Sequence, residues 1–273
     1  MREITEYGAK FMSTLDTKKN IVDRFNKEAL VWNEVHTDNI QDIIQWEVKK
    51  RKRFAHDFIR GRFQGKPAAI LEIGCGAGRN LEEILAGDAL WTGKGVDNAA
   101  AMVAHCQKQY ENNPRVGFEQ LDIDSASLDQ QFDVILLLGV VGYLDSNSKA
   151  FQNIQRMLRP GGYVIFTFGK GMGVARTLRA VTGAAKNAVR RLVRGKQSGG
   201  APTSFFRNYT WSDVKRAFPP EWELMDYENL VFGSGVLGRY SVPISRIFER
   251  LFAHHDIFRF ALTSIVVAGN KKR

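Results

Sequence analysis

The chain has 273 residues, 44% of them hydrophobic, and a formal net charge of +10. This composition can bury one sizeable core with additions, which excludes a disordered chain on compositional grounds. No apolar run reaches the roughly 18 residues of a membrane span, and the N-terminus lacks a secretory signal pattern. We therefore expect a soluble, cytoplasmic protein. The positive charge favours an acidic partner such as a phosphorylated substrate, nucleic acid or an anionic lipid surface.

The cysteines and histidines give no sign of a metal site. Cys75 and Cys106 are the two cysteines, too few for a disulfide framework or a cysteine-based zinc site. The five histidines are scattered, and the adjacent pair His254 and His255 would face apart on a regular element. We therefore predict that no metal is bound.

The N-terminal residues 1–62 are predicted to form a helical cap. Apolar side chains recur at helical spacing in two runs, from Ile21 to Trp32 and from Ile40 to Phe58. After Pro67 the pattern changes, and short apolar runs alternate with helical segments. That alternation is typical of a parallel sheet built from strand-helix units.

The predicted fold class is α/β, with a seven-stranded, mostly parallel sheet and helices on both faces. Strands are expected over residues 68–73, 91–96, 116–121, 132–138, 162–168, 222–232 and 260–268. Helices are expected over residues 78–86, 99–111, 146–158, 211–218 and 244–252. The last two strands are joined through a helix, which predicts an antiparallel element that closes the sheet.

The stretch ILEIGCGAG, residues 70–78, ends the first predicted strand with glycines at alternate positions. Gly74, Gly76 and Gly78 allow backbone angles closed to other residues and let a ligand approach the main chain. Arg79 stands where the dinucleotide fingerprint needs its third glycine, and no Gly-Lys-Ser/Thr of a P-loop follows. The pattern therefore predicts a cradle for a nucleoside without a pyrophosphate, although a simple turn is the alternative.

Acidic residues mark the ends of the first three predicted strands. Asp97 ends the second strand, where a carboxylate can accept hydrogen bonds from both hydroxyls of a ribose. Asp122 follows the third strand, where it can accept from the exocyclic amine of adenine while Ile123 supplies a backbone N–H. Glu72 precedes the glycines and either braces the loop or accepts from an amino group. Together they suit a cationic, ribose-bearing ligand; the alternative is that Asp97 and Asp122 only cap turns.

Over residues 66–168 the chain resembles the class I S-adenosylmethionine-dependent methyltransferases. ILEIGCGAG matches the first motif of that family, and Asp97 and Asp122 match its ribose-binding and adenine-side acids. FDVILLLGVVGYL matches the fourth strand and its loop, and MLRPGGYVIFTF matches the turn into the fifth strand. The resemblance implies contacts to S-adenosyl-L-methionine from Glu72, Gly74, Cys75, Gly76, Gly78, Asp97, Asn98, Asp122, Ile123, Leu138 and Gly139.

The sequence patterns, with the resemblance over residues 66–168, predict how the chain is organised. It consists of the cap (1–62), a Rossmann-like cofactor-binding core (63–168), a basic helical insertion after strand five (169–208) and a C-terminal completion of the sheet (209–273).

Three further residues receive roles from the resemblance. Tyr143 is the candidate orienting or proton-accepting group, because Gly142 and Tyr143 stand where many small-molecule members carry two histidines. Trp32 matches an aromatic segment that folds over the cofactor in such members, with core packing as its alternative. Arg53 is the candidate partner of the methionine carboxylate, with a solvated face as its alternative.

The segment 170–207 carries nine Lys or Arg residues and no Asp or Glu. Its apolar residues recur at three- and four-residue spacing, which predicts a basic amphipathic helix. Since it leaves the carboxyl end of the fifth strand, we expect a lid over the acceptor pocket. Its possible uses are gripping an anionic acceptor, docking on an acidic membrane, contacting nucleic acid, or only shielding the cofactor. Few aromatics interleave the charges, which disfavours nucleic acid.

Phe205, Phe206, Tyr209 and Trp211, beside this segment, are predicted to form the walls of an apolar acceptor pocket. The predicted protein is a monomeric or dimeric S-adenosylmethionine-dependent methyltransferase. Its acceptor is a small hydrophobic metabolite, with or without an acidic end, such as a natural product, isoprenoid or lipid-like molecule. The alternatives are an RNA methyltransferase and a methyltransferase-like binding protein that transfers nothing.

Overall fold

The computed structural model describes residues 14–28, 43–169, 207–231, 241–252, 254 and 263–271. The predictions for Trp32, Phe205 and Phe206, and for the basic segment up to residue 206, lie outside these ranges. The elements are α1 (Thr14–Glu28), α3 (Ile43–Phe63), β1 (Ala68–Ile73), α4 (Arg79–Leu85), β2 (Trp91–Asp97), α5 (Ala100–Gln109), β3 (Val116–Gln120), β4 (Phe132–Leu137), η1 (Val141–Tyr143), α6 (Asn147–Met157), β5 (Leu158–Gly169), α8 (Trp211–Ala217), β6 (Trp222–Val231), α9 (Ser241–Phe252) and β7 (Thr263–Asn270).

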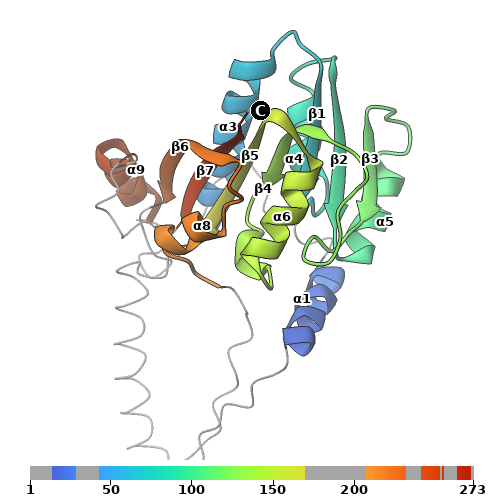
Figure 1. Cartoon of the computed structure of the whole chain (residues 1–273), viewed down its shortest axis with the longest axis horizontal. Helices are drawn as coiled ribbons and strands as arrows, with labels where there is room; N and C mark the ends of the chain where they lie inside the picture. Colours follow the sequence, from blue (N-terminus) through green and yellow to red (C-terminus); the bar gives the residue numbers. More distant parts are fainter. Residues whose placement is uncertain are drawn as a thin grey trace, which may run out of the picture.

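The strands form one seven-stranded sheet in the order β3-β2-β1-β4-β5-β7-β6 (Figure 1). Strands β1 to β5 run parallel, while β7 is antiparallel to both of its neighbours. The predicted mostly parallel sheet with an antiparallel end is therefore confirmed. The strand order reverses between β1 and β4, and open α/β sheets bind ligands outside the carboxyl ends of strands at such a point.

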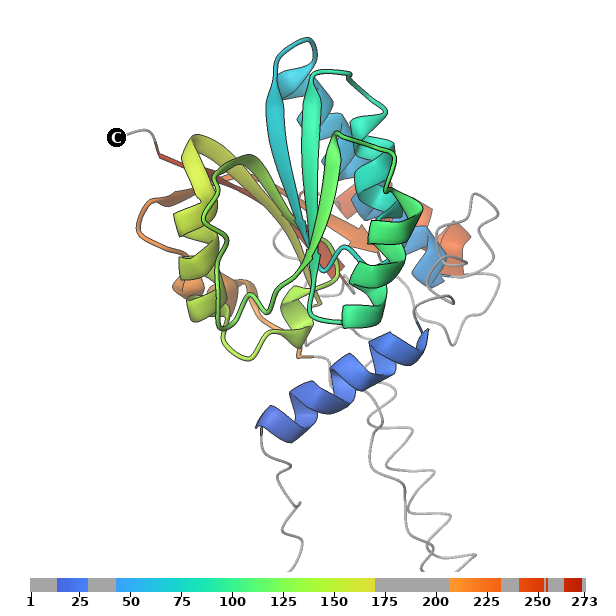
Figure 2. The ribbon, with the colours of Figure 1, turned by 90° about the vertical axis from the view of Figure 1, so that its right-hand side faces the viewer.

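Helices cover both faces of the sheet. Figure 2 shows α3, α4 and α5 on one face and α6 and α8 on the other. Ile59, Leu81 and Ile84 belong to the core on the first face, and Phe151 and Ile154 to the core on the second. Because both faces are covered, the strand β4 reads as a nearly continuous apolar run, FDVILL. Within the described ranges, no helix has both the length and the apolar character needed to cross a membrane.

Strand β5 begins four residues before the strand predicted from residue 162. Helix α6 ends at Met157 and the chain passes directly into the strand, so the LRPGG sequence belongs to β5. Phe132 pairs with Leu158 while Val134 pairs with Tyr163, which is a shift of register. The glycines therefore form a bulge inside the strand.

Helix α1 lies across the carboxyl ends of the parallel strands (Figure 2). Phe25 packs on Ala99 and Met102 at the start of α5. Asn26 Oδ1 accepts a hydrogen bond of 2.9 Å from the backbone N–H of Ala101. This contact caps α5, whose own N-cap residue, Ala99, supplies no capping side chain. α1 is thus docked on the end of the sheet where a ligand site is expected.

The aromatic cluster around Phe151 provides a test of the core between the sheet and α6. Its ring lies 5.3 Å from that of Phe166, 6.1 Å from Phe218 and 5.1 Å from Trp222, joining α6 to β5 and β6. We predict that Phe151→Ala lowers the free energy of unfolding by about 3–5 kcal/mol, because it leaves a cavity in this cluster. Urea denaturation measures the loss. The control is Leu90→Ala, a side chain that is 49% exposed, with an expected change below about 1 kcal/mol. Equal losses of unfolding free energy in the two variants would show that Phe151 is not part of a tightly packed core.

Candidate functional site

A cavity of about 520 Å³ lies at the carboxyl ends of the parallel strands, under α1 and α3. Its volume falls in the range of small-molecule sites. Most residues predicted to bind a cofactor line it: Glu72, Gly74, Cys75, Gly76, Asp97, Asn98, Asp122, Ile123, Leu138 and Gly139, together with Tyr143. The fold therefore brings into one place residues that are far apart in the sequence.

Glu72 is a buried carboxyl group whose hydrogen bonding is incomplete. Its side chain is 4% exposed, and Asn80 Nδ2 donates to Oε1 at 2.6 Å. Among the described residues, Oε2 has no hydrogen-bond partner. Burial and the charge of Asp97 raise the pKa of Glu72 from 4.5 to about 7, although the Asn80 hydrogen bond, the charge of Arg51 and the backbone N–H of Leu81 lower it. A buried carboxylate with an open oxygen is a binding point for a cation.

The glycine loop is fixed by Asp97. Asp97 Oδ2 accepts from the backbone N–H of Gly76 at 3.1 Å, and Oδ1 accepts from that of Ala99 at 2.9 Å. Burial raises the pKa of Asp97, and these backbone donors lower it in part. Gly76 has a φ of +52°, and the space where a Cβ would stand is open. At Gly74 a Cβ would collide with Val140. The loop thus needs glycine both for packing and for access to its backbone.

Arg51, a residue that the sequence did not single out, lies in the cavity. Its guanidinium packs so closely over Gly139 that a Cβ there would collide with Nη1, and Gly139 has a φ of +85°. Burial lowers the pKa of Arg51, while Glu47, Glu72 and Tyr143 raise it. Strand β5 supports this loop, since Thr167 Oγ1 accepts from the N–H of Gly139 at 2.7 Å.

Arg53 does not line the cavity. Its side chain is 80% exposed and pairs with Asp57 at 3.5 Å. Two residues along an α-helix turn the side chain by about 200°, so Arg53 and Arg51 point in opposite directions. The run KKRKR alone does not distinguish them. The spacing of Arg51 from the buried residues Val48 and Ala55 is the signal that favours it.

Three other predicted site residues do not line the cavity either. Gly78 has a φ of +76° and lies under the ring of Tyr110, where a Cβ would come within 2.9 Å of Cε2. Tyr209 pairs its backbone N–H with the carbonyl of Gly169 at 2.9 Å. Trp211 stacks on Phe168, with ring centroids 6.1 Å apart. Phe168 does line the cavity, so Trp211 supports its wall from behind.

The cavity has one polar and one apolar wall. The polar wall consists of the strand ends described above. The apolar wall consists of Ile21, Val22 and Phe25 of α1 with Ile43, Ile44 and Val48 of α3, and the same helices also bring the charged residues Lys18, Glu47, Arg51 and Lys52 to the cavity. Phe25 meets Tyr143 of η1 edge to face, with centroids 5.4 Å apart. Tyr143 therefore stands at the junction of the two walls.

Sequence comparison points to the same class of protein as the motifs. Residues 71–166 match the family described as a methyltransferase domain. The malonyl-[acyl-carrier protein] O-methyltransferase of Halalkalibacterium halodurans is 29% identical over 160 residues, which is 56% of each chain. The chain thus spans about half the length of the curated relatives it matches.

Structural comparison places the fold in this class. Magnesium protoporphyrin IX methyltransferase from Synechocystis PCC 6803, with bound SAH, superposes with a TM-score of 0.63 and 12% identity over 93% of this chain and 100% of that chain. The [4+2]-cyclase SpnF gives a TM-score of 0.59 and 16% identity, over 93% and 96%. Identities this low show the fold alone. The fold, the position of the cavity and the family match over residues 71–166 together support a class I S-adenosylmethionine-dependent methyltransferase domain.

The buried carboxyl of Glu72 predicts a pH-dependent stability. Because its pKa is about 7 in the folded protein and 4.5 ordinarily, the folded state holds the proton over this interval and the unfolded state does not. The contribution of Glu72 to the free energy of unfolding of the wild type therefore falls as the pH rises from about 4.5 through 7. Glu72→Gln removes the charge, so relative to the wild type the variant gains up to about 3 kcal/mol between pH 5 and pH 8.

Urea denaturation at the two pH values measures this gain. Glu83→Gln is the control, since the side chain of Glu83 is 45% exposed and paired with Lys52. Its effect is expected to stay below about 1 kcal/mol at both pH values. A Glu72→Gln effect that is the same at pH 5 and pH 8 would show that Glu72 titrates normally.

Proposed function

We propose that this chain transfers the methyl group of S-adenosyl-L-methionine to a small organic acceptor. The observation that carries the proposal is the open Oε2 of Glu72, buried in the cavity near Asp97. A buried carboxylate oxygen without a donor is costly unless a ligand supplies one. The ammonium group of the methionine moiety is such a donor.

The other cavity residues fit the remaining parts of the cofactor. Arg51 would hold the methionine carboxylate, a role that the sequence had suggested for Arg53. Asp97 would accept from the ribose hydroxyls, and the open backbone at Gly76 would admit the nucleoside. Asp122 and the N–H of Ile123 would bind the edge of the adenine, and Asn98 would lie beside the ribose. When bound, the cofactor supplies a methyl group activated by a sulfonium.

In this proposal the residues of the chain act mainly by positioning. Helices α1 and α3 exclude water from the cavity, and their apolar wall aligns the acceptor with the methyl group. Such alignment alone can supply much of the rate acceleration. Tyr143 stands at the junction of the walls, where it would orient the nucleophilic atom of the acceptor or accept its proton. The reaction is a direct displacement at the methyl carbon.

The apolar helical wall favours a hydrophobic acceptor such as a natural product, isoprenoid or lipid-like molecule. Six aliphatic and aromatic side chains from α1 and α3 face the polar strand ends across the cavity. A hydrophobic small-molecule acceptor agrees with one relative's name, the ubiquinone biosynthesis O-methyltransferase of Pseudomonas putida, whereas the relative from Halalkalibacterium halodurans is named for an acceptor on a carrier protein. We propose that the basic segment 170–207 contacts this acceptor or an acidic membrane from which it is taken.

A binding protein that transfers nothing is the second candidate. One observation favours it: no histidine is among the described residues that line the cavity. Incubation with S-adenosylmethionine labelled on the methyl group and an extract of small metabolites separates the two. Transfer of label to an extractable product supports the methyltransferase.

The cofactor site is tested by replacing Asp97. We predict that Asp97→Asn weakens the binding of S-adenosylmethionine about 10- to 100-fold, because it removes the charge that strengthens hydrogen bonds from the ribose. Isothermal titration calorimetry measures the change. The matched control is Asp88→Asn, since Asp88 also accepts from two backbone N–H groups, those of Gly65 and Leu90, but lies in an exposed turn. Unchanged affinity in Asp97→Asn would refute the assignment.

Replacement of Tyr143 tests the proposed catalytic role. We predict that Tyr143→Phe lowers kcat about 10- to 100-fold, because the hydroxyl that orients or deprotonates the acceptor is lost. The affinity for S-adenosylmethionine should stay within about twofold, since the aromatic contact to Phe25 remains. Radiolabelled methyl transfer and calorimetry give the two numbers. A variant with full turnover would remove Tyr143 from the mechanism.

A further inference from the structure

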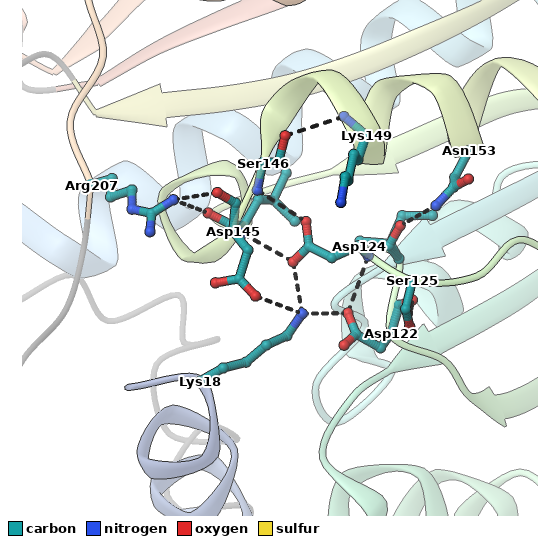
Figure 3. Close-up of polar contacts among 11 residues, drawn as sticks. Lys18, Asp122, Asp124, Ser125, Asp145, Ser146, Lys149, Asn153 and Arg207 are labelled. Atoms are coloured by element: carbon teal, nitrogen blue, oxygen red, sulfur yellow. Dashed lines mark hydrogen bonds and ion pairs between the residues drawn. The ribbon is translucent and has the colours of Figure 1, made fainter. Parts of the chain in front are cut away.

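Lys18 of α1 binds three carboxylates at the edge of the cavity (Figure 3). Its Nζ lies 2.6 Å from Asp122 Oδ1, 2.8 Å from Asp124 Oδ2 and 3.4 Å from Asp145 Oδ2. The Lys18 side chain is only 16% exposed. Asp122 and Asp124 follow β3 and Asp145 follows η1, so one amine joins α1 to two loops.

The two loops are also joined to each other. Asp124 accepts from the backbone N–H groups of Asp145 at 3.0 Å and Ser146 at 3.4 Å. Arg207 donates to the carbonyl oxygens of Leu144 and Asp145, which holds the second loop from outside (Figure 3). The fold thus gathers three carboxylates whose charges repel one another. Lys18 offsets that repulsion.

The two carboxylate oxygens of Asp122 differ in their contacts. Oδ1 accepts from Lys18 and from the backbone N–H of Asp124 at 3.1 Å. Asp122 also lines the cavity. With Oδ1 engaged twice, Oδ2 is the oxygen left to a donor in the cavity.

We propose that Lys18 is a positioning residue that selects the amino edge of the cofactor's adenine. It holds Asp122 by Oδ1, so that Oδ2 meets the exocyclic amine, and thereby links recognition of the base to the docking of α1. The proposal rests on the proposed function, because it takes the cavity to be the S-adenosylmethionine site.

The protonation state of the Lys18 amine agrees with this role. Burial lowers the pKa of Lys18, but its hydrogen bonds to Asp122 and Asp124 and their charges raise it by more, so the net change is upward. The amine is therefore cationic at neutral pH. A carboxylate held in this way accepts from an amine and repels a carbonyl oxygen at the same place. Lys18 should thus contribute to discrimination between a 6-amino and a 6-oxo purine.

The experiment compares the cofactor product with an analogue that has an oxygen at position 6 of the purine and, with it, a proton on N1; the effect of Lys18 is therefore the change in preference between variants. S-adenosyl-L-homocysteine carries the amine, and S-inosyl-L-homocysteine carries an oxygen in its place. Calorimetry gives both dissociation constants for the wild type, for Lys18→Met, which keeps an apolar stem, and for Lys19→Met. Lys19 is an exposed neighbour on the same helix and is the matched control. Thermal unfolding confirms that each variant is folded.

We expect the wild type to prefer the adenosyl ligand and Lys18→Met to reduce this preference about tenfold, the usual effect of one hydrogen bond to a charged group. Lys19→Met should keep the preference. In an Asp122→Asn background, Lys18→Met should change the preference no further, because the two residues act as one unit.

Three results would overturn the proposal. If Lys18→Met weakens both ligands equally, Lys18 only holds α1 in place. If it changes neither, the contact is an ordinary ion pair. If the wild type binds neither ligand, the cofactor site itself fails, and this outcome separates failure of the proposed function from failure of the role given to Lys18.

Discussion

The buried carboxyl of Glu72 is the constraint on which the site depends. Moving a carboxylate out of water costs several kcal/mol unless partners replace the lost hydration. Here Asn80 satisfies one oxygen, and the pKa rises to about 7. The backbone of Glu72 is fixed in the centre of the sheet, where it pairs with Gly95 of β2 and Leu136 of β4. The folded chain therefore holds a buried carboxyl group with one unpaired oxygen near the carboxyl end of its central strand, and in the proposed complex a cationic ligand would give that oxygen a donor.

The elements around Glu72 complete the cavity. The glycine loop follows β1 directly and is held by Asp97, so this side of the cavity is fixed by hydrogen bonds to the backbone. On the other side, Arg51 reaches over Gly139 and carries the opposite charge to Glu72 into the same space. Lys18 fastens α1 across the opening. The sheet edge thus carries the carboxylates, and the two helices supply both the apolar cover and the cations Lys18 and Arg51.

Much of the fold was predictable because its signals are local. β1 was predicted at its observed bounds, Ala68–Ile73, since an apolar run there is bounded by Pro67 and Gly74. Asp97 was placed in the cavity for the same reason, as the last residue of a strand. The contacts of Lys18 and Arg51 were not predictable, because they depend on how the helices pack on a distant sheet edge. The start of β5 was missed, since a bulge and a turn share the same glycine signal.

A crystal structure with S-adenosyl-L-homocysteine bound would show how the ligand lies against Glu72 and Asp97. We expect the amino group of the ligand to lie about 3 Å from Glu72 Oε2 and the ribose hydroxyls to donate to Asp97. The first contact would give a donor to a buried oxygen that has no hydrogen-bond partner among the described residues. A ligand seated outside the cavity, or one with its amino group turned away from Glu72, would contradict the account.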